Sequence, residues 1–226
     1  FNLYLEKCRK EGRPDLANNS FLYLHTSYPD IVGCWNIPKL IKENGLGSKT
    51  LFTYMCTECR LAFPSLFQDA RTMCPRCAKP SAILPSVGAG LSSQHLGEIM
   101  NLFDVYVQYA NCEGFGMPQV EAASCAVPVI STDYSAMSDV CRKLKGFPIK
   151  PVGFTRTVEE DAYKAVPDNN DFAEKAFKFL SQPQSVRQAR GLQARHAVEE
   201  HYTWDKTAKI WEDYFDRAIL TGLQGK

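Results

Sequence analysis

Short apolar runs alternate along the chain with segments whose apolar residues recur at helical spacing. The runs predict buried strands at residues 21–26, 50–54, 104–109 and 128–131. The periodic segments predict helices over residues 1–12, 37–44, from Ser92 or Ser93 onward, 118–124, and in the tail around 173–180, 184–201 and 204–215. Such alternation is typical of βαβ units, in which helices cover both faces of a parallel sheet. We therefore predict an α/β fold with a Rossmann-like parallel sheet.

Two segments stand apart from this pattern. Residues 146–170 are loop-rich and predict no clear element. In the last predicted helix, Trp204, Trp211 and Phe215 form an aromatic stripe, which we expect to pack in the core or against another domain.

The composition is that of an ordinary globular protein. Of 226 residues, 45% are hydrophobic and 23% charged, and 26 basic against 25 acidic side chains give a net charge of +1. These values exclude collagen-like, coiled-coil and fully disordered structures. The balanced charge argues against a protein surface that binds polyanions in general, although it is compatible with a local basic patch. The chain shows neither the eighteen consecutive apolar residues of a membrane helix nor a secretory signal at its start.

Nine cysteines divide into two classes. Five occur singly in apolar or mixed surroundings, where a reduced thiol behaves as a small hydrophobic group: Cys8, Cys34, Cys112, Cys125 and Cys141. Single reduced cysteines indicate a reducing compartment, so we expect a cytoplasmic protein.

The other four cysteines form two C-x-x-C pairs, Cys56 with Cys59 and Cys74 with Cys77. Two such pairs supply four thiolates at about 2.3 Å from one tetrahedral zinc ion, which leaves no position for water. We therefore predict a structural zinc ribbon, inserted over residues 55–80. A pair of redox dithiols and a chance cluster are the alternatives.

The predicted ribbon also carries basic residues. Its basic side chains are Arg60, Arg71, Arg76 and Lys79. They could contact an anionic acceptor or a partner, and a solvated charged surface explains the same residues equally simply.

A glycine-rich acidic loop precedes the predicted helix at residues 118–124. Ligands of open parallel sheets bind beyond the carboxyl ends of the strands, where this loop lies. Two glycines directly before a helix N-terminus allow a diphosphate to approach the backbone amides. Glu113 and Glu121 can face the same cleft, although a glutamate near a helix start and a Gly-x-Gly turn also have purely structural explanations.

Residues 113–122, E-G-F-G-M-P-Q-V-E-A, followed by P-V-I at 128–130, resemble the E-G-F-G-x-x-x-x-E-A-x-A-x-G-x-P-V-I signature of retaining nucleotide-sugar glycosyltransferases of the family 4 (group 1) type. The similarity extends through most of the chain outside residues 55–85. It implies the C-terminal, donor-binding half of a GT-B fold. Residues 1–226 would then form one Rossmann-like nucleotide-sugar-binding domain.

The resemblance also implies roles for individual residues. Glu113, as the catalytic residue, would contact the donor sugar hydroxyls, and Glu121 would accept hydrogen bonds from the ribose. The nucleobase would lie near Thr53 and Tyr54. The backbone around the sugar and diphosphate would come from Gly114, Phe115, Gly116, Met117 and Pro118. No divalent ion is required if amides and basic side chains neutralise the diphosphate.

Three departures accompany the resemblance. Ala126 stands where the family pattern has glycine, which is costly if the position is left-handed. The ribbon is not part of the pattern and lies near the predicted base-binding edge. We also expect the first strand with its basic pair, and the N-terminal acceptor domain, to be missing, so that this chain alone would transfer poorly.

Two functional hypotheses follow. The leading one is a hexosyltransferase-like enzyme that transfers a glycosyl group from a nucleotide-diphosphate sugar to an acceptor hydroxyl. The alternative is a non-catalytic module whose zinc ribbon binds nucleic acid or a protein partner. A glycosyltransferase that modifies DNA would combine the two.

Overall fold

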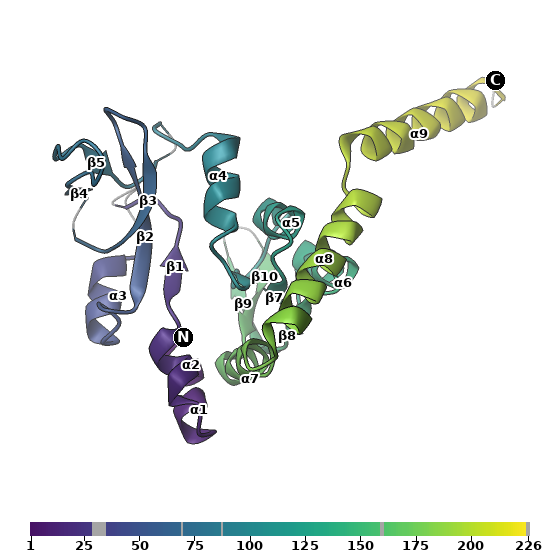
Figure 1. Cartoon of the computed structure of the whole chain (residues 1–226). Helices are drawn as coiled ribbons and strands as arrows, with labels where there is room; N and C mark the ends of the chain where they lie inside the picture. Colours follow the sequence, from purple (N-terminus) through teal and green to yellow (C-terminus); the bar gives the residue numbers. More distant parts are fainter. Residues whose placement is uncertain (29–34, 69, 87, 159–160, 225–226) are drawn as a thin grey trace. The chain divides into compact units, whose positions relative to one another are not determined.

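The computed structural model describes residues 1–28, 35–68, 70–86, 88–158 and 161–224. The chain divides into two units, Phe1–Leu102 and Phe103–Lys226 (Figure 1). Cys34 lies outside the described residues. Among the described helices, none has both the length and the apolar character that a bilayer crossing requires.

The first unit is built around strand β2. Its elements are α1 (Asn2–Lys10), α2 (Pro14–Asn19), β1 (Leu22–Leu24), α3 (Ile37–Glu43), β2 (Thr50–Cys56), β3 (Ala62–Leu66), β4 (Arg71–Thr72), β5 (Ala82–Ile83) and α4 (Ser93–Met100). Strand β2 is parallel to β1 and antiparallel to β3 and β5, and β5 pairs with β4. The ribbon strands β3 to β5 are thus hydrogen-bonded members of the same sheet as the β1–β2 pair.

The core of the first unit lies on one face of β2. Phe52, Tyr54 and Cys56 are fully buried at alternating positions, so they share that face. They pack with Ile41 of α3 and with Leu84. The paired cysteines of the ribbon are therefore part of the hydrophobic core of this unit, with Cys56 and Cys74 buried in it and Cys59 and Cys77 packed against it.

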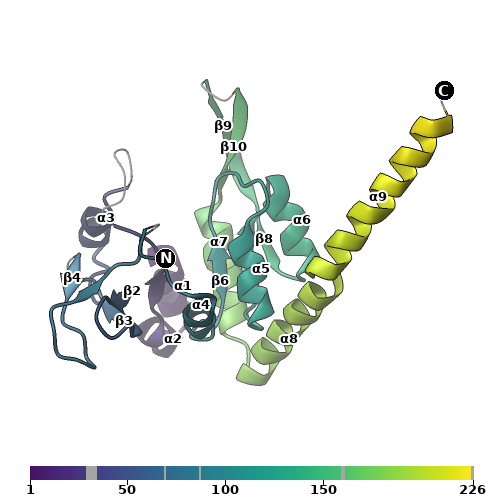
Figure 2. The same cartoon turned by 90° about the horizontal axis from the view of Figure 1, so that it is seen from above.

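The second unit contains a three-stranded parallel sheet with β7 in the middle. Its elements are β6 (Tyr106–Gln108), α5 (Met117–Ser124), β7 (Val129–Thr132), α6 (Ser135–Lys143), β8 (Phe147–Ile149), β9 (Pro151–Thr157), β10 (Ala162–Pro167), α7 (Asn169–Leu180), α8 (Gln184–His201) and α9 (Trp204–Gln224). Strands β9 and β10 form a separate antiparallel hairpin (Figure 2).

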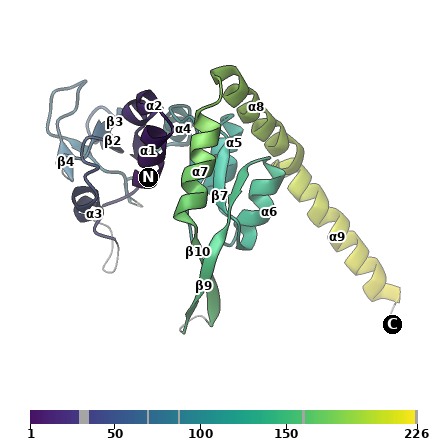
Figure 3. The same ribbon diagram turned by 90° about the horizontal axis from the view of Figure 1, so that it is seen from below.

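Helices cover both faces of this sheet. Val129 packs with residues of α5, α6 and α8 in one buried cluster. Ile130 points to the opposite face and pairs in register with Phe147, whose ring lies 5.3 Å from that of Phe179 on α7. Figure 3 shows α7 on one side of β7 and α6 on the other. The predicted α/β fold is confirmed. Its parallel strands lie in two different sheets, β1 and β2 in one and β6, β7 and β8 in the other.

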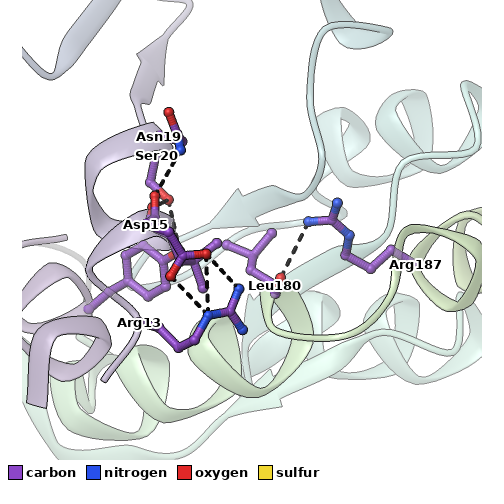
Figure 4. Close-up of polar contacts among 8 residues, drawn as sticks. Arg13, Asp15, Asn19, Ser20, Leu180 and Arg187 are labelled. Carbon is purple, nitrogen blue, oxygen red and sulfur yellow. Dashed lines mark hydrogen bonds and ion pairs between the residues drawn. The ribbon is translucent and has the colours of Figure 1, made fainter. Parts of the chain in front are cut away.

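Polar contacts fix helix junctions within each unit (Figure 4). In the first unit, Arg13 donates to both carboxylate oxygens of Asp15 at the start of α2, at 3.0 and 2.9 Å. This hydrogen bond lowers the pKa of the Asp15 carboxyl. In the second unit, Arg187 donates to the Leu180 carbonyl at 3.4 Å, which ties α8 to the end of α7.

Several elements differ from the prediction. Pro14 begins α2 in its first turn, where a proline is tolerated, instead of marking the end of the preceding helix. Residues 146–170, with no predicted element, contain β8, β9 and β10. The hairpin strands expose large apolar side chains, with Val152, Phe154 and Tyr163 65%, 55% and 57% exposed, while the small Ala165 is buried. The apolar pattern of the sequence therefore does not follow burial there.

The expectation of a core position is wrong for the aromatic stripe of α9. Trp204 is 86% exposed, and Trp211 and Phe215 are 55% and 54% exposed. Trp211 and Phe215 stack on each other one helical turn apart, with ring centroids 5.5 Å apart.

Ala126 adopts the left-handed conformation that its sequence position suggests. Its φ is +59°. Its N–H donates to the Ala123 carbonyl at 2.9 Å, and the Val127 N–H donates to Ala122 at 3.0 Å. This pair of bonds is a Schellman motif, whose left-handed position favours glycine because a Cβ is strained there.

We expect Ala126→Gly to stabilise the chain by about 1 kcal/mol, because it relieves this strain. The melting temperature should rise by about 2–4 °C. Ala189→Gly in the exposed part of α8 is the matched control and should lower it, since glycine is a poor helix former. An unchanged or lower melting temperature for Ala126→Gly would show that the turn carries no strain.

Candidate functional site

The carboxyl ends of β6, β7 and β8 meet at one edge of the parallel sheet. The loop after β6 contacts the segment after β7 there, because the backbone N–H of Glu113 donates to Ser135 Oγ at 3.1 Å. Ser135 begins α6 with a φ of +51°. The sequence gives no signal for this Ser135 contact.

The Glu113 side chain is held by a neighbour on β6. Gln108 Nε2 donates to Glu113 Oε1 at 3.1 Å, and Tyr106 Oη donates to Gln108 Oε1 at 2.6 Å. Burial, followed by the charges of Glu113 and Glu121, raises the pKa of Tyr106 to about 12. The negative charges of Glu113 and Glu121 both oppose ionisation of this hydroxyl.

The loop turns into α5 at Gly116, which has a φ of +81°. A Cβ there would lie 2.7 Å from Nε2 of the buried Gln119, so the position requires glycine both for conformation and for space. Phe115 and Met117 flank it and are 42% and 58% exposed. Pro118 stands in the first turn of α5 and has no N–H to offer a ligand.

The residues predicted for the site around α5 therefore lie close together. Gly114, Phe115, Gly116, Met117 and Pro118 form the turn into the helix, and Glu113 precedes it. Glu121 follows on α5 and is half-buried. The helix N-terminus adds a partial positive charge at this edge. The arrangement combines two carboxylates, suited to hydroxyl groups, with a helix end suited to an anion.

Tyr54 lies in the first unit and is fully buried. Its hydroxyl accepts a hydrogen bond from the Gln68 N–H at 3.2 Å, and its ring stacks on Phe63. Thr53 is also buried and bonds to Tyr23 and His25. Strand β2 continues to Cys56, so Tyr54 is inside the strand and not at its end. A role in base binding stays a prediction.

The four paired cysteines converge in the first unit. All four Sγ atoms of Cys56, Cys59, Cys74 and Cys77 lie within 4.8 Å of one another. Cys56 and Cys77 Sγ are 3.7 Å apart, and Cys59 and Cys74 Sγ are 3.6 Å apart. Four thiolates at about 2.3 Å from one zinc ion stand about 3.8 Å apart, so the donor set fits a tetrahedral metal.

The two C-x-x-C turns have the same backbone geometry. In each, the residue after the second cysteine donates its N–H to the carbonyl of the first: Arg60 to Cys56 at 3.0 Å and Ala78 to Cys74 at 2.9 Å. Both residues are left-handed, with φ of +59° and +54°. This repeated turn brings the two thiols of each pair to one side.

Hydrogen bonds favour the thiolate at two of the four cysteines, Cys56 and Cys74. Burial opposes ionisation of Cys56, but bonds from Ser81 Oγ, at 3.1 Å, and from the backbone amides of Cys59 and Glu58 outweigh it and lower its pKa to about 6. The pKa of Cys74 is lowered in the same way. At Cys59 the backbone N–H of Leu61 favours ionisation, but burial and the neighbouring Cys56 and Cys74 outweigh it and raise its pKa to about 11. Ser81 is a supporting residue that the cysteine spacing alone does not reveal.

The basic face of the ribbon is exposed. Arg60, Arg71 and Arg76 are exposed, and Lys79 pairs with Glu58 at 3.1 Å. The pairing neutralises part of the positive charge. Binding of nucleic acid or a protein by this face stays a prediction.

Comparisons with known proteins place this geometry in a family context. Residues 88–189 match the family described as glycosyl transferases group 1. A curated relative, the UDP-N-acetylglucosamine–peptide N-acetylglucosaminyltransferase GtfA subunit of Streptococcus parasanguinis, is 24% identical over 129 residues. The match covers 56% of this chain and 23% of the relative.

Two solved structures share the fold. Sucrose-phosphate synthase from Thermosynechococcus elongatus has a TM-score of 0.54 at 16% identity, over 82% of this chain and 34% of that chain. A TarM variant of S. aureus, crystallised with fondaparinux, alpha-GlcNAc-glycerol and UDP, has a TM-score of 0.51 at 17% identity, over 95% and 32%. The chain therefore spans about a quarter to a third of the length of these proteins. Together the comparisons support a glycosyltransferase group 1 domain with a GT-B-like fold, whose family pattern covers residues 88–189.

Proposed function

We propose that this chain is the donor-binding part of a retaining, hexosyltransferase-like glycosyltransferase, C-terminal in its enzyme. It would bind a nucleotide-diphosphate sugar and pass the glycosyl group to an acceptor hydroxyl. One observation carries the proposal: Glu113 is fixed by Gln108 and Ser135 in the loop that leads into the N-terminus of α5, at the carboxyl edge of a parallel sheet. This edge lies inside the stretch that matches the family.

The roles follow from the chemistry of each group. Glu113, as the catalytic residue, accepts hydrogen bonds from the donor sugar and holds it while the diphosphate departs. The turn from Gly114 to Met117 and the positive end of α5 stabilise the growing charge on the diphosphate. In a retaining reaction, the acceptor hydroxyl attacks from the face that the diphosphate leaves. Glu121 binds the ribose diol.

The comparisons suggest the first nucleotide to test. The curated relative is named for UDP-N-acetylglucosamine, and the TarM structure contains UDP. We therefore propose a uridine nucleotide sugar as the leading donor candidate.

We also propose that the four-cysteine cluster binds one structural zinc ion. Cys56, Cys59, Cys74 and Cys77 would supply all four ligands, as the separations of their sulfur atoms favour. Four protein ligands leave no position for substrate, so the metal contributes stability and no chemistry.

Glu121→Ala is expected to weaken nucleotide binding about tenfold or more, because a hydrogen bond to a charged group contributes about 1.5–3 kcal/mol. Calorimetric titration of the zinc-loaded chain with UDP, GDP, ADP and their sugar conjugates would measure this effect. Glu199→Ala, on the exposed face of α8, removes a carboxylate outside the site and serves as the control. Unchanged nucleotide affinity in Glu121→Ala would remove Glu121 from the site.

A further inference from the structure

A row of three side chains leads from the interior of the second unit to Glu113. Tyr106 and Gln108 stand two residues apart on β6, so their side chains lie on the same face of the sheet. Tyr106 packs against the buried cluster around Val129, and Gln108 is only 6% exposed. The tyrosine hydroxyl contacts the amide of Gln108, and the amide contacts the carboxylate of Glu113.

The chemistry of the two ends determines how the Gln108 amide is oriented. Tyr106 is a neutral phenol, which can donate its proton to Gln108 Oε1 at 2.6 Å. The carboxylate of Glu113 can only accept, so the NH₂ group of Gln108 must face it, at 3.1 Å. The reversed amide would place its oxygen against a carboxylate oxygen, which is repulsive. The row therefore has a single favourable polarity, with each group donating toward Glu113.

Glu113 is thus held at two points. Its backbone N–H donates to Ser135 Oγ at 3.1 Å, and its Oε1 atom accepts from Gln108. Fixing both ends restricts the rotamers of the side chain. Oε2 is then the carboxylate oxygen that we assign to the ligand. Because Gln108 is neutral, it orients the carboxylate without cancelling its charge, as a lysine or arginine would.

We propose that Gln108, oriented by Tyr106, is a positioning residue that sets the Glu113 carboxylate against the donor sugar. The inference rests on the proposed function, in which Glu113 contacts the sugar and Glu121 contacts the ribose. It adds a specific consequence: the row governs recognition of the sugar and leaves recognition of the nucleoside diphosphate unaffected. A residue that only supported the fold would affect both.

The test uses Gln108→Met, which keeps the length of the side chain but removes both the carbonyl and the NH₂ of its amide, and Tyr106→Phe, which removes only the donor hydroxyl. Each zinc-loaded variant is titrated with UDP and UDP-N-acetylglucosamine, or with the GDP or ADP pair if wild type binds that pair instead. We expect affinity for the nucleotide sugar to fall about fivefold to tenfold in Gln108→Met and less in Tyr106→Phe. Affinity for the free nucleotide should stay the same.

A double variant shows whether Gln108 acts through Glu113. Gln108→Met combined with Glu113→Ala should bind the nucleotide sugar no more weakly than Glu113→Ala alone, because the carboxylate that Gln108 positions is already absent. Gln94→Met is the matched control, since Gln94 donates to Glu98 in an exposed pair on α4, and it should bind like wild type. Melting temperatures report any general loss of structure.

Three outcomes would overturn the inference. Equal losses for nucleotide and nucleotide sugar would show that Gln108 serves the fold alone. Additive losses in the double variant would show that Gln108 acts independently of Glu113. If Glu113→Ala itself binds the nucleotide sugar like wild type, or if wild type binds none of the probes, the proposed function fails, and the positioning role fails with it. Only this last result contradicts the proposed function, whereas the first two contradict the role of the row alone.

Discussion

Removal of zinc from the four-cysteine cluster is expected to unfold the first unit at 25 °C. Structural zinc contributes about 10–16 kcal/mol in small metal-dependent domains, which exceeds the free energy of unfolding of most domains. Cys56 and Cys74 belong to the same buried cluster as Phe52 and Tyr54, so loss of the metal also disturbs the aromatic core. Four thiolates within 4.8 Å of one another would repel each other without a cation.

Two measurements test this prediction. Elemental analysis should find one zinc ion per chain, and circular dichroism should show loss of structure when a strong chelator is added. Cys74→Ser should reproduce the effect, whereas Cys112→Ser, at an exposed single cysteine, should not. A chain that keeps its melting transition after metal removal would mean that strand pairing and packing alone hold the ribbon.

Gly191→Ala is expected to destabilise the second unit by about 3 kcal/mol, at the upper end for an overpacked core. Gly191 lies in α8, where the helix passes against the turn that ends α5. A Cβ at this position would lie 1.9 Å from the Ala126 carbonyl oxygen and 2.9 Å from its carbon. Both obstructing atoms are backbone, so the helix itself must move away.

Gly97→Ala provides the comparison for this variant. Gly97 also lies within a helix, α4, but a Cβ there meets no atom within 4 Å. Alanine should therefore stabilise the chain at this position by about 1 kcal/mol, through helix propensity alone. Denaturant unfolding of the two variants should give changes of opposite sign. Equal stability for Gly191→Ala and wild type would disprove close packing of α8 on the α5 turn.

Local chemistry accounts for the parts of the site that the sequence predicts. The spacing of the C-x-x-C pairs restricts their thiols to one side of a tight turn, so the cluster is predictable from four residues. The turn at Gly116 is predictable because a turn and a helix start depend on neighbouring residues, whereas the roles of Glu113 and Glu121 come from the family resemblance and stay predictions. Likewise, Ala126 is left-handed where the pattern calls for glycine.

The supporting residues depend on contacts distant in the sequence. Nothing distinguishes Gln108, Ser135 or Ser81 in the sequence, because each acquires its role only when a loop or a second turn folds back on it. Tyr54 shows the opposite error: the apolar run predicts a strand end there, but ladder pairing with β3 and β5 extends β2 to Cys56. Where a strand ends because of its pairing with other strands, the local sequence pattern does not predict that end.

In strand β2, the packing of the aromatic core and the position of the predicted metal ligand both depend on the register with β3. Phe52, Tyr54 and Cys56 alternate on one face, so a slip of one residue against β3 would turn the aromatic rings and the ligand sulfur away together. Met55 would then occupy the ligand position, and a thioether is a poor substitute for a thiolate on zinc. The proposed zinc site can therefore form only when β2 and β3 pair in the correct register, and binding of zinc during synthesis would select that register over a slipped one.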